Sequence, residues 1–169
     1  KNFKNIKSIA LAKSEIIQNT KPKGFIVLNA DDSFFKFHRN IALKNNLKVI
    51  SFGIKNQKSN ISFKNIHRSG KYFLINIEYK NLKKTFLISN NFQSNIYNVL
   101  GAIAVMSIYL NIFQLNKNIF LNFETPNGRG DISQIKIMNK NLNLIDESYN
   151  SNPLSLKSAI LNFEIIDSK

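Results

Sequence analysis

The pattern of apolar and polar positions predicts alternating strands and helices in the first third of the chain. Apolar residues at helical spacing over 5–19 predict an amphipathic helix. Continuous apolar runs at 24–30 and 47–52 are typical of buried parallel strands, and 33–45 between them predicts a helix. This strand–helix–strand order favours a parallel sheet.

From residue 60 onward the period changes to two. Apolar and polar residues alternate over 60–89, with turns expected at Ser69-Gly70 and at Asn81. The pattern predicts three antiparallel strands that extend the sheet with one face half-exposed.

The longest predicted helix covers 92–111, where one apolar stripe runs through small residues that permit close packing. A short helix over 116–122 follows it. Expected N-caps are Asp32 or Ser33 for the helix at 33–45, and Ser94 or Asn95 for the helix at 92–111, because such side chains accept hydrogen bonds from free backbone N–H groups.

The last quarter predicts a β-hairpin and then a helix. Two alternating runs, 132–138 and 142–145, are separated by the turn-prone 139–141, and Pro153 occupies a favourable first-turn position of a helical pattern. The pattern alone favours an ordinary hairpin with a solvated acidic end. The alternative is a ligand site in the polar loop 146–152, because ligands bind where strands end and helices begin.

Composition indicates a globular chain with an unusual charge. Its 169 residues are 43% hydrophobic, include 14 Phe and no Cys, and carry a formal net charge of +14. The absence of cysteine excludes disulfides and thiolate metal sites. No apolar run has membrane-spanning length and no signal-peptide core is present, so we expect a cytoplasmic protein.

The charge raises the possibility of a nucleic-acid-binding module. However, the lysines are scattered among many Asn, Ile and Phe residues, a mixture that indicates an AT-rich genome rather than a binding face. His38 and His67 stand apart and predict no metal cluster. A basic nucleic-acid-binding module stays open as the alternative to an enzyme.

Two strings near the C-terminus, Gly128-Arg129-Gly130 and D-E-S-Y-N-S-N-P (Asp146 to Pro153), resemble motifs of the Mur ligase family. Gly128-Arg129-Gly130 is similar to a G-R-G motif near the end of that family's central ATPase domain. The string D-E-S-Y-N-S-N-P, from Asp146 to Pro153, resembles its D-D-S-Y-N-A-N-P loop early in the C-terminal domain. Glu147 stands where the family has aspartate, which moves the carboxylate one methylene further out.

Other parts of the chain resemble the same family. The string A-L-A-K-S-E-I contains Lys13, which by itself predicts a lysine whose stem lies along the edge of the core. In the family the corresponding lysine is carbamylated and presents an oxygen to Mg²⁺. Asn95 and Asn98 match the H-N-x-x-N-x-x-A-A helix that meets adenine, although Ser94 replaces the histidine. The string N-A-D-D at 29–32 is also similar.

The resemblance implies an α/β fold in two parts. Residues 1–128 would be the later part of the central ATP-binding domain, a mostly parallel sheet with an antiparallel extension and flanking helices. Residues 129–169 would begin a Rossmann-like C-terminal domain. The chain contains no G-x-x-x-x-G-K-[ST] phosphate-binding loop. We therefore expect a fragment that is inactive by itself.

The implied activity is ATP- and Mg²⁺-dependent joining of D-alanyl-D-alanine to UDP-N-acetylmuramoyl-tripeptide through an acyl phosphate. This is a step of peptidoglycan synthesis, on which cell-wall biogenesis, cell shape and cell division depend. A monomer without nucleic-acid or membrane partners is expected. One remaining alternative is another enzyme with this fold, such as folylpolyglutamate synthase. A further alternative is a degenerate protein that is kept only as an interaction partner.

The resemblance also implies the roles of particular residues. Lys13 and Arg129 would be catalytic, with Lys13 binding magnesium as a carbamate. Residues that contact the nucleotide would be Asn95, Asn98, Arg129 and Glu147. Residues that line the loop closing on substrate would be Ser148, Tyr149, Asn150 and Asn152.

Overall fold

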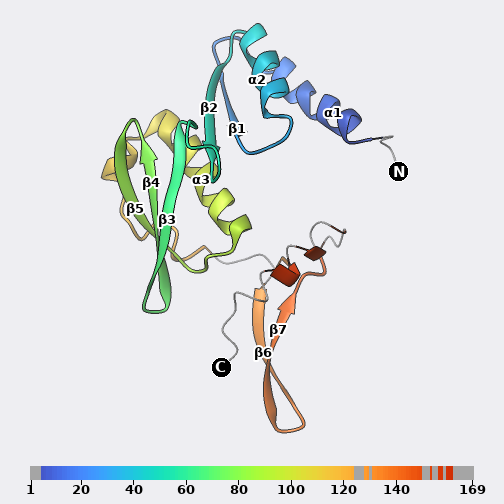
Figure 1. Ribbon diagram of the computed structural model, residues 1–169, viewed down its shortest axis with the longest axis vertical. Helices are drawn as coiled ribbons and strands as arrows, with labels where there is room; N and C mark the ends of the chain where they lie inside the picture. Colours follow the sequence, from blue (N-terminus) through green and yellow to red (C-terminus); the bar gives the residue numbers. More distant parts are fainter. Residues whose placement is uncertain are drawn as a thin grey trace. The chain divides into compact units, whose positions relative to one another are not determined.

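The computed structural model describes residues 5–123, 128–129, 131–149, 153, 156–157 and 159–161. The chain divides into two compact units, Lys1–Leu121 (unit 1) and Asn122–Lys169 (unit 2), which are described separately below. Figure 1 gives the labels of the elements. The predicted domain boundary between residues 128 and 129 stays a prediction.

Unit 1 alternates helices and strands in the predicted order. Its elements are α1 (Ile6–Gln18), β1 (Phe25–Asn29), α2 (Phe35–Lys44), β2 (Lys48–Gly53), β3 (Ile61–Ser69), β4 (Tyr72–Tyr79), β5 (Leu82–Ile88), α3 (Gln93–Tyr109) and a short 3₁₀ helix, η1 (Ile112–Gln114).

The five strands of unit 1 form one sheet in the order β1-β2-β3-β4-β5. β1 pairs with β2, and β2 with β3, in parallel, whereas β3, β4 and β5 are antiparallel neighbours. β2 and β3 share only the register pairs Phe52–Ile61 and Gly53–Ser62, so the two strands diverge beyond this contact. The predicted parallel sheet with an antiparallel extension and flanking helices is confirmed.

The main hydrophobic core lies between α3 and the sheet, side by side in Figure 1. Leu100 and Ile103 on α3 and Ile75, Ile77 and Phe86 on the strands are fully buried. A smaller cluster of Ile17, Ala42 and Leu47 holds α1 and α2 beside the first two strands. The first two strands therefore have helices on both faces, as their continuous apolar runs predict.

The predicted helix caps are wrong. α2 begins after Phe34 and α3 after Phe92, and neither of these N-cap residues makes a side-chain capping bond. Asp32 instead accepts a hydrogen bond from Phe34 N at 2.7 Å, which closes a turn ahead of the helix. Asn95 lies inside α3 and donates back to Asn90 O at 3.2 Å.

The helix predicted over 116–122 is also wrong. The short 3₁₀ helix η1 comes earlier, and the later segment runs alongside β5, with Leu87 N donating to Lys117 O at 2.7 Å and an isolated bridge between Ile88 and Phe120. Phe120 is buried and its ring meets that of Phe86 edge-on, with centroids 5.4 Å apart. This core contact overrides the local helical pattern.

Unit 2 contains an antiparallel hairpin of β6 (Asp131–Ile137) and β7 (Lys140–Asp146). The turn consists of Met138 and Asn139, both with positive φ (48° and 63°), a conformation typical of tight two-residue hairpins. The predicted hairpin is confirmed, with a shorter turn than expected. The described residues of 153–161 are helical, in agreement with the helix predicted from Pro153.

Candidate functional site

Lys13 lies on α1 and is exposed, in contrast to its neighbour Ser14, which is buried and donates to Leu11 O at 2.6 Å. α1 is joined to α2 by His38, whose Nε2 lies 3.0 Å from Ala10 O. The helix is therefore held against α2, while the side chain of Lys13 is exposed to solvent. Carbon dioxide forms a carbamate with a neutral amine that it can reach, and the exposure of Lys13 meets the second of these two conditions.

The described residues do not by themselves form a complete metal site. They contain no group of three or more His, Cys, Asp or Glu side chains that could hold an ion. A carbamate on Lys13 would supply one oxygen ligand to Mg²⁺, and this hard cation takes several such ligands.

Asn95 and Asn98 lie one turn apart at the start of α3, which buries its opposite side in the main core. Asn95 is half-buried, and its amide nitrogen is engaged by Asn90 O. Asn98 is exposed, and among the described residues its amide has no hydrogen-bond partner. An exposed amide offers both a donor and an acceptor, which suits the edge of a purine base.

Asp31, at the carboxyl end of β1, is the centre of a hydrogen-bond network that the sequence did not predict. Its carboxylate accepts from the backbone N–H groups of Ile54 (2.6 Å), Lys55 (2.9 Å) and Asn56 (2.7 Å). The hydroxyl of Tyr97 on α3 also donates to it, at 2.9 Å.

The charge state of this network follows from its geometry. Burial raises the pKa of Asp31, but the hydrogen bonds from the backbone and from Tyr97 outweigh it and leave the pKa below its usual value of 3.8. Burial, the hydrogen bond to Asp31 and the charge of Asp31 raise the pKa of Tyr97 to about 12. At neutral pH the donor and the acceptor are therefore fixed.

In unit 2 the two strings of the predicted site lie against each other. Tyr149 N donates to Gly128 O at 3.0 Å, and the guanidinium of Arg129 lies 4.1 Å from the centroid of the Tyr149 ring. Gly128 has φ of +76°, and a Cβ there would lie 2.9 Å from Tyr149 N, so a larger residue would push the two segments apart.

The strand end beside this contact forms a second turn. Asp146 accepts a hydrogen bond from Ser148 N at 2.9 Å, and its pKa lies below the usual value because of hydrogen bonds from the side chain and backbone of Ser148. Glu147 is half-buried and Tyr149 is exposed. Asn150 and Asn152 lie outside the described residues.

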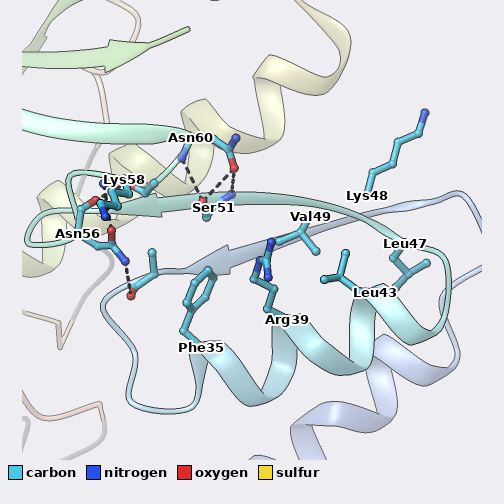
Figure 2. A pocket seen from close by; sticks show the side chains of 12 residues that line it. Phe35, Arg39, Leu43, Leu47, Lys48, Val49, Ser51, Asn56, Lys58 and Asn60 are labelled. Atoms are coloured by element: carbon cyan, nitrogen blue, oxygen red, sulfur yellow. Dashed lines mark hydrogen bonds between the residues drawn. The ribbon is translucent and has the colours of Figure 1, made fainter. Parts of the chain in front are cut away.

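A pocket of about 560 Å³ lies elsewhere in unit 1, between α2, β2 and the loop 54–60. Figure 2 shows Phe35 and Arg39 extending from α2 toward β2. Ser51 on β2 and Asn60, which are hydrogen-bonded to each other, also line the pocket. None of the predicted site residues lines this pocket.

The structure thus brings together some predicted residues but not all. Arg129 and Tyr149 are in contact within unit 2, and Asn95 and Asn98 share one end of α3 in unit 1. No hydrogen bond among the described residues links Lys13 to either asparagine. Their roles stay predictions.

Comparison with known proteins decides the family. The model of the Mur ligase middle domain matches residues 1–106, which is more than half of the chain. The chain belongs to the Mur ligase family.

One curated relative in this family is UDP-N-acetylmuramoyl-tripeptide--D-alanyl-D-alanine ligase of Buchnera aphidicola subsp. Acyrthosiphon pisum (strain APS). It is 34% identical over 164 residues, covering 94% of this chain and 34% of the relative. The chain therefore spans about a third of the length of this Mur ligase.

Solved Mur ligase structures share the fold. A crystal structure of MurF from Acinetobacter baumannii matches 98% of this chain and 34% of its own, with a TM-score of 0.74 and 19% identity. MurF ligase from Thermotoga maritima, solved in complex with ADP, matches 95% of this chain and 35% of its own, with a TM-score of 0.72 and 20% identity. At these identities the likeness concerns the fold alone.

Two residues of interest were missed from the sequence, Asp31 and Tyr97. A signal for Asp31 was present, because the N-A-D-D string at the end of a buried strand places a carboxylate at the ligand-binding edge of a parallel sheet. No local signal pairs Asp31 with Tyr97, 66 residues further on.

Proposed function

We propose that this chain is part of an ATP-dependent ligase of peptidoglycan synthesis, which joins D-alanyl-D-alanine to UDP-N-acetylmuramoyl-tripeptide. The observation that carries this proposal is the similarity, along 94% of the chain, to a ligase whose name states that reaction. The contact between Arg129 and Tyr149 supports it, because it joins the two strings on which the resemblance rests.

The reaction has two steps. The carboxylate of the tripeptide attacks the terminal phosphorus of ATP, which forms an acyl phosphate and releases ADP. The amine of D-alanyl-D-alanine then attacks the acyl carbon, so that an amide bond forms, inorganic phosphate leaves and a proton is lost from nitrogen. Both steps develop negative charge on phosphoryl oxygens, which cationic groups stabilise.

On the nucleotide, Asn98 would read the edge of adenine and Asn95 would support it. The exposed amide of Asn98, which has no hydrogen-bond partner among the described residues, is available for this. Asn95 can still accept a hydrogen bond through its side-chain oxygen, because its bond to Asn90 uses the amide nitrogen. Lys13, as a carbamate, would give one oxygen to Mg²⁺. Since the described residues do not complete a metal site, no step is derived through the ion.

In unit 2, Arg129 would bind phosphate or ribose, and the ring of Tyr149, whose centroid lies 4.1 Å from the guanidinium carbon, would help to orient it. Glu147 lies two residues before Tyr149 in the sequence and is half-buried, and it would contact the nucleotide. The loop formed by Ser148, Tyr149, Asn150 and Asn152 would close on the substrate. The residues that cradle the phosphates are not among these 169, which contain no phosphate-binding loop.

The test is a substrate panel with the full-length protein that contains this chain. We expect ADP release that requires both UDP-N-acetylmuramoyl-tripeptide and D-alanyl-D-alanine, with the amide product seen by mass spectrometry. Turnover with a folate and glutamate instead would assign the chain to another ligase of this fold. These 169 residues alone should show no turnover, and ligase activity from them would contradict the assignment of the phosphate cradle to other residues.

A further inference from the structure

The hydrogen bonds of Asp31 join three segments that are distant in sequence. They link the end of β1 to the loop that follows β2 and to the first turns of α3, over separations of 23 to 66 residues. The loop contacts come from backbone N–H groups, so they depend on the path of the chain and not on the side chains there. Asp31 therefore fixes both the loop and the helix relative to the sheet.

The space around the carboxylate admits little adjustment. Gly53 immediately precedes the loop, and a Cβ at that position would lie 3.1 Å from Asp31 Oδ1. Asn56, one of the three backbone donors, also lines the pocket of Figure 2, whereas Asp31 does not. The four hydrogen bonds and the close approach of Gly53 hold the carboxylate in place.

The start of α3 depends on this contact more than on capping. Its N-cap, Phe92, makes no side-chain capping bond. The hydrogen bond from the Tyr97 hydroxyl to Asp31 instead links this end of the helix to the end of β1. Tyr97 directly precedes Asn98, whose exposed amide we assign to adenine. A helix start free to rotate by a few degrees would carry that amide away from its partner.

We propose that Asp31 and Tyr97 are a positioning pair, which sets the start of α3 so that Asn98 meets the adenine of ATP. Neither residue needs to touch the nucleotide. This inference rests on the proposed function and adds to it the residues that orient the adenine site.

The first experiment compares Tyr97→Phe with Tyr109→Phe in the full-length enzyme. Both remove one hydroxyl from α3, but Tyr109 is 81% exposed at the far end of the helix. We expect Tyr97→Phe to raise the KM for ATP roughly 2- to 10-fold, the effect of one hydrogen bond, with kcat and the KM for D-alanyl-D-alanine nearly unchanged. Tyr109→Phe should change none of these.

A double-mutant comparison then shows whether the effect passes through Asn98. If it does, Tyr97→Phe raises the KM for ATP in the wild-type background and adds nothing in the Asn98→Ala background. Additive effects would overturn the proposal, as would a Tyr97→Phe enzyme that loses thermal stability while the KM for ATP stays unchanged. Asp31→Asn, which removes the charge and keeps the shape, should reproduce the rise in KM.

The same measurements separate failure of this inference from failure of the proposed function. If Asn98→Ala raises the KM for ATP and Tyr97→Phe does not, the adenine assignment stands and the positioning pair is overturned. If Asn98→Ala leaves the KM unchanged, the adenine assignment fails and the positioning pair fails with it.

Discussion

The start of α3 in unit 1 and the Arg129 turn in unit 2 hold their candidate residues by different means. α3 is anchored by Leu100 and Ile103, both fully buried, and by the bond from Tyr97 to Asp31. Arg129 is exposed, its guanidinium contacts the ring of Tyr149, and the neighbouring Gly128 O accepts a hydrogen bond from Tyr149 N.

The burial of the two units explains this difference. In unit 1, α3 and the sheet bury their apolar side chains in one common core. In unit 2, the apolar side chains of the hairpin are close to half exposed, for example Leu144 (46%) and Ile132 (47%). A shared core fixes the buried face of a helix. A turn with little buried surface has to fix its residues by local contacts, which are individually weak.

The largest effect is expected at Lys13, an exposed residue on a well-held helix. If Lys13 carries the proposed carbamate, Lys13→Ala should nearly abolish turnover of the full-length enzyme, because it removes the oxygen that this carbamate would give to Mg²⁺. Added acetate or formate should restore part of the activity by occupying the vacated position. The measurement is the rate of ADP release with and without carboxylate.

Lys7 provides the matched control, since it is another exposed lysine on α1. Lys7→Ala should leave turnover unchanged, because exposed charges contribute little to stability. Near-wild-type activity in Lys13→Ala would end the metal-ligand hypothesis. Lost stability without rescue would make Lys13 a structural residue.

The second prediction tests the difference in burial directly. Leu100→Ala should lower the free energy of unfolding by about 2–5 kcal/mol, because it leaves a cavity in the core. Leu144→Ala on the hairpin should lower it by less than about 1 kcal/mol, since the side chain is already 46% exposed. Urea titrations followed by circular dichroism give both values, and similar losses would contradict the contrast between the units.

Sequence periodicity predicted most elements of unit 1 because the apolar positions that repeat along a strand or helix are the ones that the fold buries. The alternation in β4 and β5 and the stripe on α3 each correspond to side chains that the structure buries. The predictions failed where a distant contact competes with local preference. Phe120 joins the core beside Phe86 and prevents a helix, a pairing that no window of neighbouring residues contains.

The same reason limits the prediction of the site. Motif resemblance singled out Arg129 and Tyr149, which the structure places in contact. The tie between Asp31 and Tyr97 belongs to no motif, because it needs the sheet to bring the end of β1 beneath α3. Helix caps were missed for a related reason, since Asp32 closes its own turn before α2 begins.

The third prediction concerns Asn98 on the well-anchored side of the comparison. If Asn98 binds adenine as proposed, Asn98→Ala should weaken ATP binding by about 1–3 kcal/mol, because the polar edge of adenine would then be unpaired in its site. The free energy of unfolding should change little, since the side chain is exposed and has no partner among the described residues. Isothermal titration gives the affinity, and Gln93→Ala, also exposed on α3, is the control.

A fourth prediction uses the titration of the Asp31–Tyr97 tie. The pKa of Tyr97 is raised from 10.0 to about 12 in the folded protein. The hydrogen bond of its protonated hydroxyl to Asp31 therefore stabilises the fold fully below pH 10, and this stabilisation is lost as the pH rises toward 12. The pKa of Asp31 is lowered, so its contribution is complete above pH 3.8 and is lost as the pH falls through its value in the folded state.

Between pH 10 and 12 the free energy of unfolding should therefore fall less in Tyr97→Phe than in the wild type. The difference between the two losses should be at most about 2 kcal/mol. Because many lysines titrate over the same range, the comparison needs Tyr109→Phe, which has the same lysines and should follow the wild type. Identical pH curves for all three proteins would show that the hydroxyl of Tyr97 is not tied to Asp31 in solution.

The smallest effect is expected at the exposed contact of unit 2, where Tyr149 has two separable parts. If its ring orients Arg129, then Tyr149→Phe keeps that contact, and Tyr149→Leu loses about 0.5–1 kcal/mol, the value of an exposed cation–π pair. That loss corresponds to a change of roughly 2- to 5-fold in the KM for ATP. If instead the hydroxyl binds substrate, both variants raise the KM for D-alanyl-D-alanine equally. Steady-state kinetics of the two variants, with each substrate varied in turn, separates these roles. Equal KM values for ATP in Tyr149→Phe and Tyr149→Leu would show that the ring does not orient Arg129.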